Sequence, residues 1–362
     1  HSSVSGTVKK IDKYPHISGT SVPTVVIEND ETDEIEPSLK GIPEDEITPE
    51  KIIEVARNFG IVGLGGATFP AAIKMSPPKG KSFDTVILNG AECEPYLTSD
   101  HRLMLEFTEE IIKGGLLVQK ATKAAKLIIA VEENKPDAIN LFEKYRDKYE
   151  FEVAVLKTKY PQGGEKQLIK AVLGREVPEG GLPVDVGAYV QNVGTAYAIW
   201  DAVYNGMPLV KRIVTVTGAV NKRKNLRVPI GTPIAHLIDY CGGYMGTPGK
   251  IISGGPMMGI ALYTDEIPVT KGTSGILVQR EEEMVLDEPT NCIRCGRCVN
   301  VCPMNLMPNL LGDYSENNMH DLSKEIGVLN CIECGSCSYV CPAKRHLVQL
   351  IKTTKFQLKR KR

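Results

Sequence analysis

Eight cysteines in the last quarter of the sequence repeat one spacing twice. The first set is Cys292, Cys295, Cys298 and Cys302, and the second set is Cys331, Cys334, Cys337 and Cys341. A proline follows each set, so both sets read C-x-x-C-x-x-C-x-x-x-C-P, and each cysteine of the second set lies 39 positions after its counterpart. A secreted disulfide framework would spread the ten cysteines through the 362 residues, so this clustering indicates metal ligation in a reducing compartment.

This spacing suits two iron–sulfur cubes better than two zinc ions. Three cysteines at three-residue steps can wrap one cube, and the fourth lies too far along the chain to close the same cube, so it ligates the partner cluster, as in two-cluster ferredoxins. We therefore expect one [4Fe–4S] cluster on Cys292, Cys295, Cys298 and Cys341, and a second on Cys302, Cys331, Cys334 and Cys337. Structural zinc, the alternative, usually uses two C-x-x-C pairs. Two clusters this close together would form a one-electron relay.

A glycine-rich loop at 60–70, with Lys74 shortly after it, is the second chemical feature. The loop does not complete G-x-G-x-x-G, because Thr68 occupies the last position, and it follows an expected helix rather than a strand. Its bare backbone N–H groups could cradle a phosphate. A tight packing turn explains the same residues equally well.

Three further segments place polar groups where a ligand could meet that loop. Residues 89–95 follow an expected strand end, where open α/β sheets place ligands, and residues 160–166 and 191–195 each open a helix. Helix N-termini and asparagine amides suit phosphate, ribitol and the polar edges of a flavin ring. Each segment taken alone could equally be a turn or a helix cap.

The elements that must position these groups alternate along the chain. We expect strands at 84–88, 126–131 and 151–156, and helices at 50–58, 102–125, 136–148, 165–173 and 195–205. The long helix could break at Gly114–Gly115, and 174–190 reads as a loop. This alternation predicts a mostly parallel α/β layer, followed by a small β-rich module at 211–278 and a mostly helical cysteine-rich segment.

Composition and charge narrow the class of protein. Hydrophobic residues make up 42% and charged residues 24%, as in globular proteins. The near balance of 43 Lys+Arg against 44 Asp+Glu, with 6% aromatic residues, argues against nucleic-acid binding. Apolar runs such as 127–131 are far shorter than the roughly 18 residues of a membrane span. The sequence opens with His1, so we expect residues 1–49 to be a fragment of a longer N-terminal module.

The order of these segments resembles the flavin-binding subunit of respiratory complex I. That family's G-R-G-G-A-G-F-P-x-G-x-K loop is similar to 63–74, its N-x-D-E-x-E-P to 89–95, its Y-x-x-G-E-E to 160–165 and its N-N-V-E-T to 191–195. The β-rich module resembles the β-grasp-like (SLBB-type) domain that follows there. A double ferredoxin segment in place of a single-cluster end points to a related family, the RnfC proteins of Rnf electron-transport complexes. Residues 1–8 are similar to the end of the lipoyl-like barrel-sandwich of RnfC proteins.

The resemblance implies a division of the chain and a set of ligands. The parts are a barrel-sandwich fragment with linker (1–49), an FMN/NADH-binding α/β domain (50–210), the SLBB-type domain (211–278) and a double [4Fe–4S] domain (279–362). The implied FMN contacts are Gly63, Gly65, Gly66, Lys74, Asn89, Glu92, Gly163, Gly164, Asn192 and Thr195. The implied NAD(H) contacts are Phe69, Glu94 and Glu165. No catalytic side chain is expected, because hydride transfer to a flavin needs no protein base.

This sequence departs from the complex I motifs at several charged positions. Leu64 replaces the loop arginine of that family, and Met75 replaces a common tryptophan. Ala91 replaces an acidic residue, and Gly164 and Gly194 each replace a glutamate. Fewer charges therefore surround the expected ring position than in that family.

The implied function is electron transfer between NAD(H), FMN and two [4Fe–4S] clusters in an ion-translocating ferredoxin:NAD oxidoreductase. Lacking a span, the chain would bind membrane subunits and a ferredoxin-type iron–sulfur protein at the cytoplasmic side of the cell membrane. Two alternatives remain: a soluble flavin/iron–sulfur reductase, such as a microcompartment cobalamin reductase, and a flavin-free electron-relay scaffold.

Overall fold

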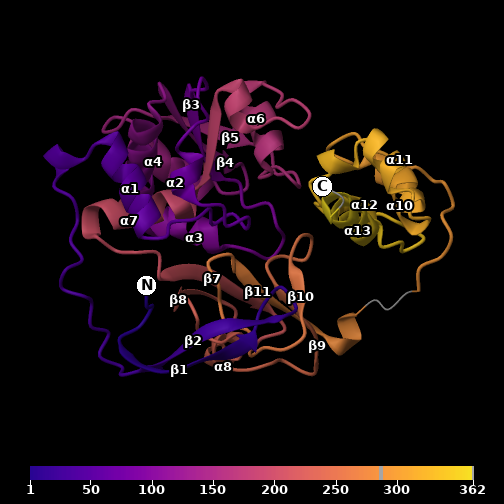
Figure 1. Cartoon of the computed structure of the whole chain (residues 1–362), viewed down its shortest axis with the longest axis horizontal. Helices are drawn as coiled ribbons and strands as arrows, with labels where there is room; N and C mark the ends of the chain where they lie inside the picture. Colours follow the sequence, from indigo (N-terminus) through magenta and orange to yellow (C-terminus); the bar gives the residue numbers. More distant parts are fainter. Residues whose placement is uncertain (285–287, 361–362) are drawn as a thin grey trace. The chain divides into compact units, whose positions relative to one another are not determined.

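The computed structural model describes residues 1–284 and 288–360, which form two compact units (Figure 1). The first unit is His1–Val177 with Pro183–Glu283, and the second is Pro178–Leu182 with Met284–Arg362. No helix in these described ranges is both long enough and apolar enough to cross a bilayer.

A four-stranded parallel sheet is the centre of the first unit. Its order is β5-β4-β3-β6, and the strands are β3 (Thr85–Gly90), β4 (Lys126–Glu132), β5 (Glu152–Leu156) and β6 (Ala188–Asn192). The chain adds β4 and β5 on one side of β3 and then returns to its other side with β6. The strand order therefore reverses at the carboxyl ends of β3 and β6, which is where sheets of this class bind ligands.

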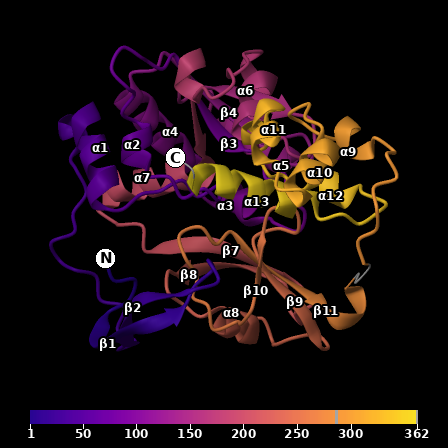
Figure 2. The same cartoon turned by 45° about the vertical axis from the view of Figure 1, so that its right-hand side comes forward.

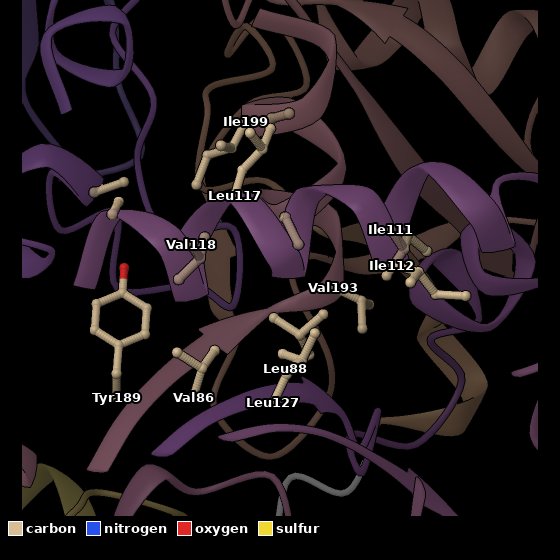
Figure 3. Packing of buried hydrophobic residues seen from close by; sticks show 14 of the residues in the cluster. Val86, Leu88, Ile111, Ile112, Leu117, Val118, Leu127, Tyr189, Val193 and Ile199 are labelled. Atoms are coloured by element: carbon tan, nitrogen blue, oxygen red, sulfur yellow. The ribbon is translucent and has the colours of Figure 1, made fainter. Parts of the chain in front are cut away.

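Helices cover both faces of this sheet, as a parallel sheet requires. They are α1 (Pro49–Asn58), α2 (Ala71–Lys74), α3 (Ser99–Glu106), α4 (Thr108–Thr122), α5 (Pro136–Lys144), α6 (Glu165–Leu173) and α7 (Val193–Asn205). Figure 3 shows α4 side chains such as Ile112 and Val118 over Val86 and Leu88 of β3. On the opposite face, α6 packs Leu168 and neighbouring residues against the sheet.

The expected break of the long helix at Gly114–Gly115 is wrong. The chain breaks at Phe107, between α3 and α4, and both glycines lie inside α4. A Cβ on Gly114 would lie 2.0 Å from the Ala196 carbonyl oxygen of α7, and one on Gly115 would lie 2.8 Å from Leu88. These glycines therefore allow α4 to pack closely on its neighbours and do not end the helix.

The prediction of a loop over 174–190 is also wrong for its last three residues, because β6 begins at Ala188. This strand is short and follows a glycine- and proline-rich stretch, so it gives little signal in the sequence. Its buried Tyr189 packs edge-on against Phe83 at a ring distance of 5.3 Å.

A second, five-stranded sheet in the first unit has the order β10-β9-β11-β7-β8 (Figure 2). Its strands are β7 (Lys211–Gly218), β8 (Lys224–Pro229), β9 (Pro248–Ser253), β10 (Ile260–Leu262) and β11 (Gly275–Arg280). Helix α8 (Ile234–Tyr240) packs on this sheet. Strands β1 (Gly6–Pro15) and β2 (Ser21–Asn29) form an antiparallel hairpin, and short 3-10 turns lie at Glu44–Glu46, Pro183–Val186 and Glu281–Glu283.

The second unit is helical over its described residues. Its helices are α9 (Arg297–Asn300), α10 (Pro308–Glu316), α11 (His320–Glu325), α12 (Ser336–Tyr339) and α13 (Leu347–Arg360), with a 3-10 turn at Val328–Asn330. Helices α9 and α12 occupy the same positions in the two cysteine repeats. Buried Leu347 and Ile351 let α13 contribute to both small cores.

Candidate functional site

The eight repeated cysteines surround two separate cavities of the second unit. The first cluster cavity is lined by Cys292, Cys295, Cys298 and Cys341. The second cluster cavity is lined by Cys302, Cys331, Cys334 and Cys337. Each cavity thus joins three cysteines of one motif to the last cysteine of the other, which is the grouping that the spacing predicts.

The two motifs present their thiols with the same backbone conformation. Arg294 and Glu333, which follow the first cysteine of each motif by two residues, both have positive φ angles of 56° and 60°. The Arg294 N–H donates to Cys292 Sγ over 3.4 Å, and the Glu333 N–H donates to Cys331 Sγ over 3.3 Å. Such N–H···S bonds to ligand sulfurs tune iron–sulfur clusters. The repeated spacing therefore encodes repeated geometry.

The donor set and its arrangement fit [4Fe–4S] clusters. Across residues 1–284 and 288–360, no three His, Cys, Asp or Glu side chains converge as a single metal ion requires. Four thiols line each cavity, which is the number of cysteine ligands that a [4Fe–4S] cluster takes. Burial raises the pKa of the Cys337 thiol to about 12.

The flavin contacts implied by the resemblance gather at the carboxyl edge of the parallel sheet. Asn89 and Asn192 are direct Cα partners at the ends of β3 and β6, where the strand order reverses. Asn192 caps α7 by accepting from the Gly194 N–H over 2.8 Å. Asn89 Nδ2 donates to the Gly163 carbonyl over 2.9 Å, which ties β3 to the loop before α6.

The glycine-rich loop is fastened to the same edge. Thr195, fully buried on α7, accepts a hydrogen bond from the Leu64 N–H over 2.8 Å. A Cβ on Gly65 would lie 3.6 Å from Asn192 Cβ, so the loop passes beside the start of α7. Four segments that are remote in the sequence therefore meet at one place.

The surroundings of two loop glycines bear on whether the loop is a ligand cradle or a packing turn. Neither Gly63 nor Gly65 has the left-handed φ that favours glycine, and a Cβ would meet nothing closer than 3.7 Å at Gly63 and 3.6 Å at Gly65. Gly163 is different, because a Cβ there would lie 2.4 Å from the Ala91 carbonyl oxygen. The Gly63 N–H donates to the Phe69 carbonyl over 2.8 Å and so closes the loop. At Gly65, where neither packing nor φ requires glycine, a ligand lying against the bare N–H group explains the residue.

The charged residues of the predicted site pair with one another. Lys74 Nζ, at the end of α2, lies 2.6 Å from Glu165 Oε1 at the start of α6. Lys74 also lies 5.7 Å from the centre of the Tyr189 ring. The two half-buried groups neutralise each other, so an anionic ligand would compete with Glu165 for the lysine. Gly164 is the residue before Glu165 and lies at the N-terminus of α6. Phe69, at the end of the glycine-rich loop, is 51% exposed.

Two predicted contact residues use their carboxylates within the protein. Glu92 accepts from the N–H groups of Asp100 and His101 at 3.0 and 3.1 Å, at the beginning of α3. Burial, with the Asp100 carboxyl beside it, raises the pKa of Glu92 to about 7. Glu94 accepts from the N–H groups of Met257 and Met258 at 3.1 and 2.6 Å. Glu94 therefore joins the sheet edge to the loop between β9 and β10.

Sequence reasoning missed Asp100 as part of this edge. Asp100 Oδ2 accepts from Asn192 Nδ2 over 2.7 Å and thereby fixes the orientation of the amide that caps α7. Burial raises the Asp100 pKa, and buried Arg212 opposes that shift. No sequence motif connects Asp100 to Asn192. The one feature of the sequence that could have indicated a role for Asp100 is its position at the start of a helix.

Four protein families match successive parts of the chain. The RnfC barrel sandwich hybrid domain matches residues 1–32, the Nuo51 FMN-binding domain 56–201, the SLBB domain 213–261 and the 4Fe-4S dicluster domain 284–342. These matches confirm the fold class expected from the sequence.

Curated relatives extend the similarity to nearly the whole chain. One component of the Na(+)-translocating ferredoxin:NAD(+) oxidoreductase complex of Acetobacterium woodii is 49% identical, over 99% of this chain and 82% of the relative. The equivalent component of the proton-translocating ferredoxin:NAD(+) oxidoreductase complex of Clostridium ljungdahlii is 47% identical, over 98% and 78%. A component of the ion-translocating oxidoreductase complex of Rhodobacter capsulatus is 42% identical, over 85% and 60%.

Solved structures share the fold at low sequence identity. The NAD+-reducing [NiFe]-hydrogenase in its H2-reduced state aligns with a TM-score of 0.58 and 19% identity, over 89% of this chain and 67% of that chain. Its air-oxidised state aligns with a TM-score of 0.55, over 86% and 54%.

Proposed function

Since the chain belongs to the RnfC family of ion-translocating ferredoxin:NAD oxidoreductase (Rnf) complexes, we propose that it carries electrons between NAD(H), one FMN and two [4Fe–4S] clusters. The observation that carries this proposal is the pairing of two four-cysteine cavities with a ligand cradle at the switch point of a parallel sheet.

The cluster ligands follow the two cavities. Cys292, Cys295, Cys298 and Cys341 hold the first cluster, and Cys302, Cys331, Cys334 and Cys337 hold the second. Backbone N–H groups orient the first sulfur of each motif. The exchange of the fourth ligand keeps the two clusters close together, which suits rapid one-electron transfer between them.

The FMN is held at the carboxyl edge of β3 and β6. Gly63 shapes the loop, since its N–H donates to the Phe69 carbonyl over 2.8 Å. The backbone N–H groups of Gly65 and Gly66 meet the phosphate, and Lys74 supplies the positive charge. The segments around Asn89, Glu92, Gly163, Gly164, Asn192 and Thr195 complete the cradle. Bound flavin supplies the chemistry that accepts two electrons together and passes them on singly.

NAD(H) approaches the same edge beside Phe69, Glu94 and Glu165. The half-exposed Phe69 ring offers a surface for a nicotinamide or adenine ring. Glu94 acts here mainly by holding Met257 and Met258 next to the site. No side chain is required to move a proton, and the residues serve to bind and orient.

The chain acts as a peripheral member of the complex. We place it on the cytoplasmic side of the cell membrane, bound to membrane subunits of the complex and to a ferredoxin-type iron–sulfur protein. The division into 1–49, 50–210, 211–278 and 279–362 remains our proposal, with one change: β11 ends at Arg280, so the third part extends to 280 and the fourth begins at 281.

An anaerobic preparation tests this function. We expect about one FMN and about eight iron atoms per chain, with flavin and iron–sulfur bands in the absorbance spectrum. Iron without flavin would favour the relay scaffold. Flavin and iron in a chain that co-purifies with microcompartment shell proteins, and not with membrane subunits, would favour the reductase.

A further inference from the structure

The two cluster cavities are equivalent in the repeat but not in their exposure. Cys295 of the first cavity is exposed, whereas its counterpart Cys334 is only 7% exposed. Ile293 next to it is 67% exposed, and its counterpart Ile332 is half-buried. An electron can therefore reach the first cluster from the surface over a shorter path than the second.

The first motif also carries more unpaired charge at its surface than the second motif does. Arg294 and Arg297 are exposed, and over the described ranges neither guanidinium group forms an ion pair or a hydrogen bond. Their counterparts are Glu333, which Lys355 neutralises, and Ser336, which is buried. Between these matched positions of the described chain, unpaired cations therefore lie beside the first cavity and not beside the second.

We propose that the first cluster edge, consisting of Ile293, Arg294, Cys295 and Arg297, is the docking surface for an acidic one-electron iron–sulfur protein. The inference rests on the proposed function and says which cluster exchanges electrons with a partner. An apolar centre with a charged rim has the anatomy of a transient protein interface. Unpaired arginines steer an acidic partner and fix its orientation.

The redox step at this edge is simple. One electron leaves the reduced cluster of the partner and reduces the first cluster, or moves in the reverse direction, and no bond forms or breaks. An anionic membrane would also attract the arginines and accept Ile293, but a lipid surface exchanges no electron with a cluster, so the exposed ligand Cys295 favours a redox protein. The protein partner therefore fits the surface better.

The second motif supplies the test variant. R294E/R297S installs the residues that the second motif already carries, and Glu333 shows that glutamate adopts the required positive φ of about 60°. The control K79E/K222S makes the same charge change at two exposed lysines of the first unit that form no ion pair in the described ranges. Iron analysis of each variant shows whether the first cluster is retained. The single variant R297S leaves Arg294 in place and still tests the surface if the double variant loses that cluster.

Binding to an acidic two-[4Fe–4S] ferredoxin, measured by calorimetry at low and at moderate salt, is the readout. We expect R294E/R297S to weaken binding about tenfold, R297S about threefold and the control less than twofold, with a smaller salt dependence in the double variant. Unchanged ferredoxin affinity in an iron-replete R294E/R297S protein would overturn the docking surface. A double variant that loses binding to anionic phospholipid vesicles but keeps its ferredoxin affinity would overturn the docking surface as well.

Failure of the proposed function gives a different result. Wild-type protein that contains flavin and iron but whose flavin is not bleached by NADH would contradict the function, whatever the ferredoxin affinity. Bleaching by NADH together with unchanged ferredoxin binding in R294E/R297S would reject only the docking surface.

Discussion

Replacing Gly65 by alanine tests whether the glycine-rich loop exists for a ligand. The new Cβ would lie 3.6 Å from Asn192, an ordinary contact, and the backbone there has no left-handed φ. The folded protein accommodates it, and the unfolding free energy should rise by about 0.4–1 kcal/mol because the unfolded chain loses freedom. The methyl group, however, occupies the space next to the N–H groups that we propose to bind the phosphate.

Losing one charge-assisted hydrogen bond to that phosphate costs about 1.5–3 kcal/mol of binding free energy. The Kd for FMN should therefore increase by a factor of roughly 10 to 150 in G65A. Quenching of FMN fluorescence by the apoprotein measures this Kd, and urea unfolding of the same apoprotein measures stability.

The matched control is G114A in the same domain. Its Cβ would lie 2.0 Å from the Ala196 carbonyl oxygen, so α4 and α7 must separate, at a cost of about 1–3 kcal/mol of unfolding free energy. FMN affinity of the folded protein should change little. If G65A bound FMN as tightly as wild type, or lost as much stability as G114A, the loop would be a packing turn.

Three other predictions follow from the same geometry. Burial raises the pKa of Glu92 from its usual 4.5 to about 7, so the stability that the protonated carboxyl contributes at low pH is lost as pH rises from about 4.5 to 7; relative to E92Q, wild type should lose about 2 kcal/mol of unfolding free energy between pH 5 and pH 7 in urea titrations, and parallel pH profiles would contradict this. E94A should speed amide exchange at Met257 and Met258 by removing their acceptor, as mass spectrometry can measure, and unchanged exchange would mean that the contact is unimportant. C341S should remove the first cluster and about half of the iron although it lies in the second motif; loss of the second cluster instead would show that ligands are not exchanged.

Local features of this protein are readable from its sequence because their causes are local. The cysteine spacing sets the backbone of each motif, and the same positive φ recurs at Arg294 and Glu333. The strand at 84–88 is close to β3, and the helix at 165–173 matches α6. In each case, neighbouring residues within one element carry the signal.

Features that depend on distant packing were not readable. Gly114 breaks a helix by its propensity, yet α4 continues because α7 needs that close approach. The short strand β6 exists because it pairs with β3 in the sheet, not because of strong local preference. The Asp100–Asn192 contact and the attachment of Glu94 to Met258 join segments more than 90 residues apart, and no local pattern encodes them.

The most direct test of electron transfer through this chain is an anaerobic titration of the FMN- and iron-replete protein with NADH, followed by absorbance. We predict that flavin absorbance bleaches first and that iron–sulfur absorbance then decreases, because both groups belong to one electron path. A protein that holds about one FMN and about eight iron atoms, yet keeps its flavin oxidised in excess NADH, would contradict this path.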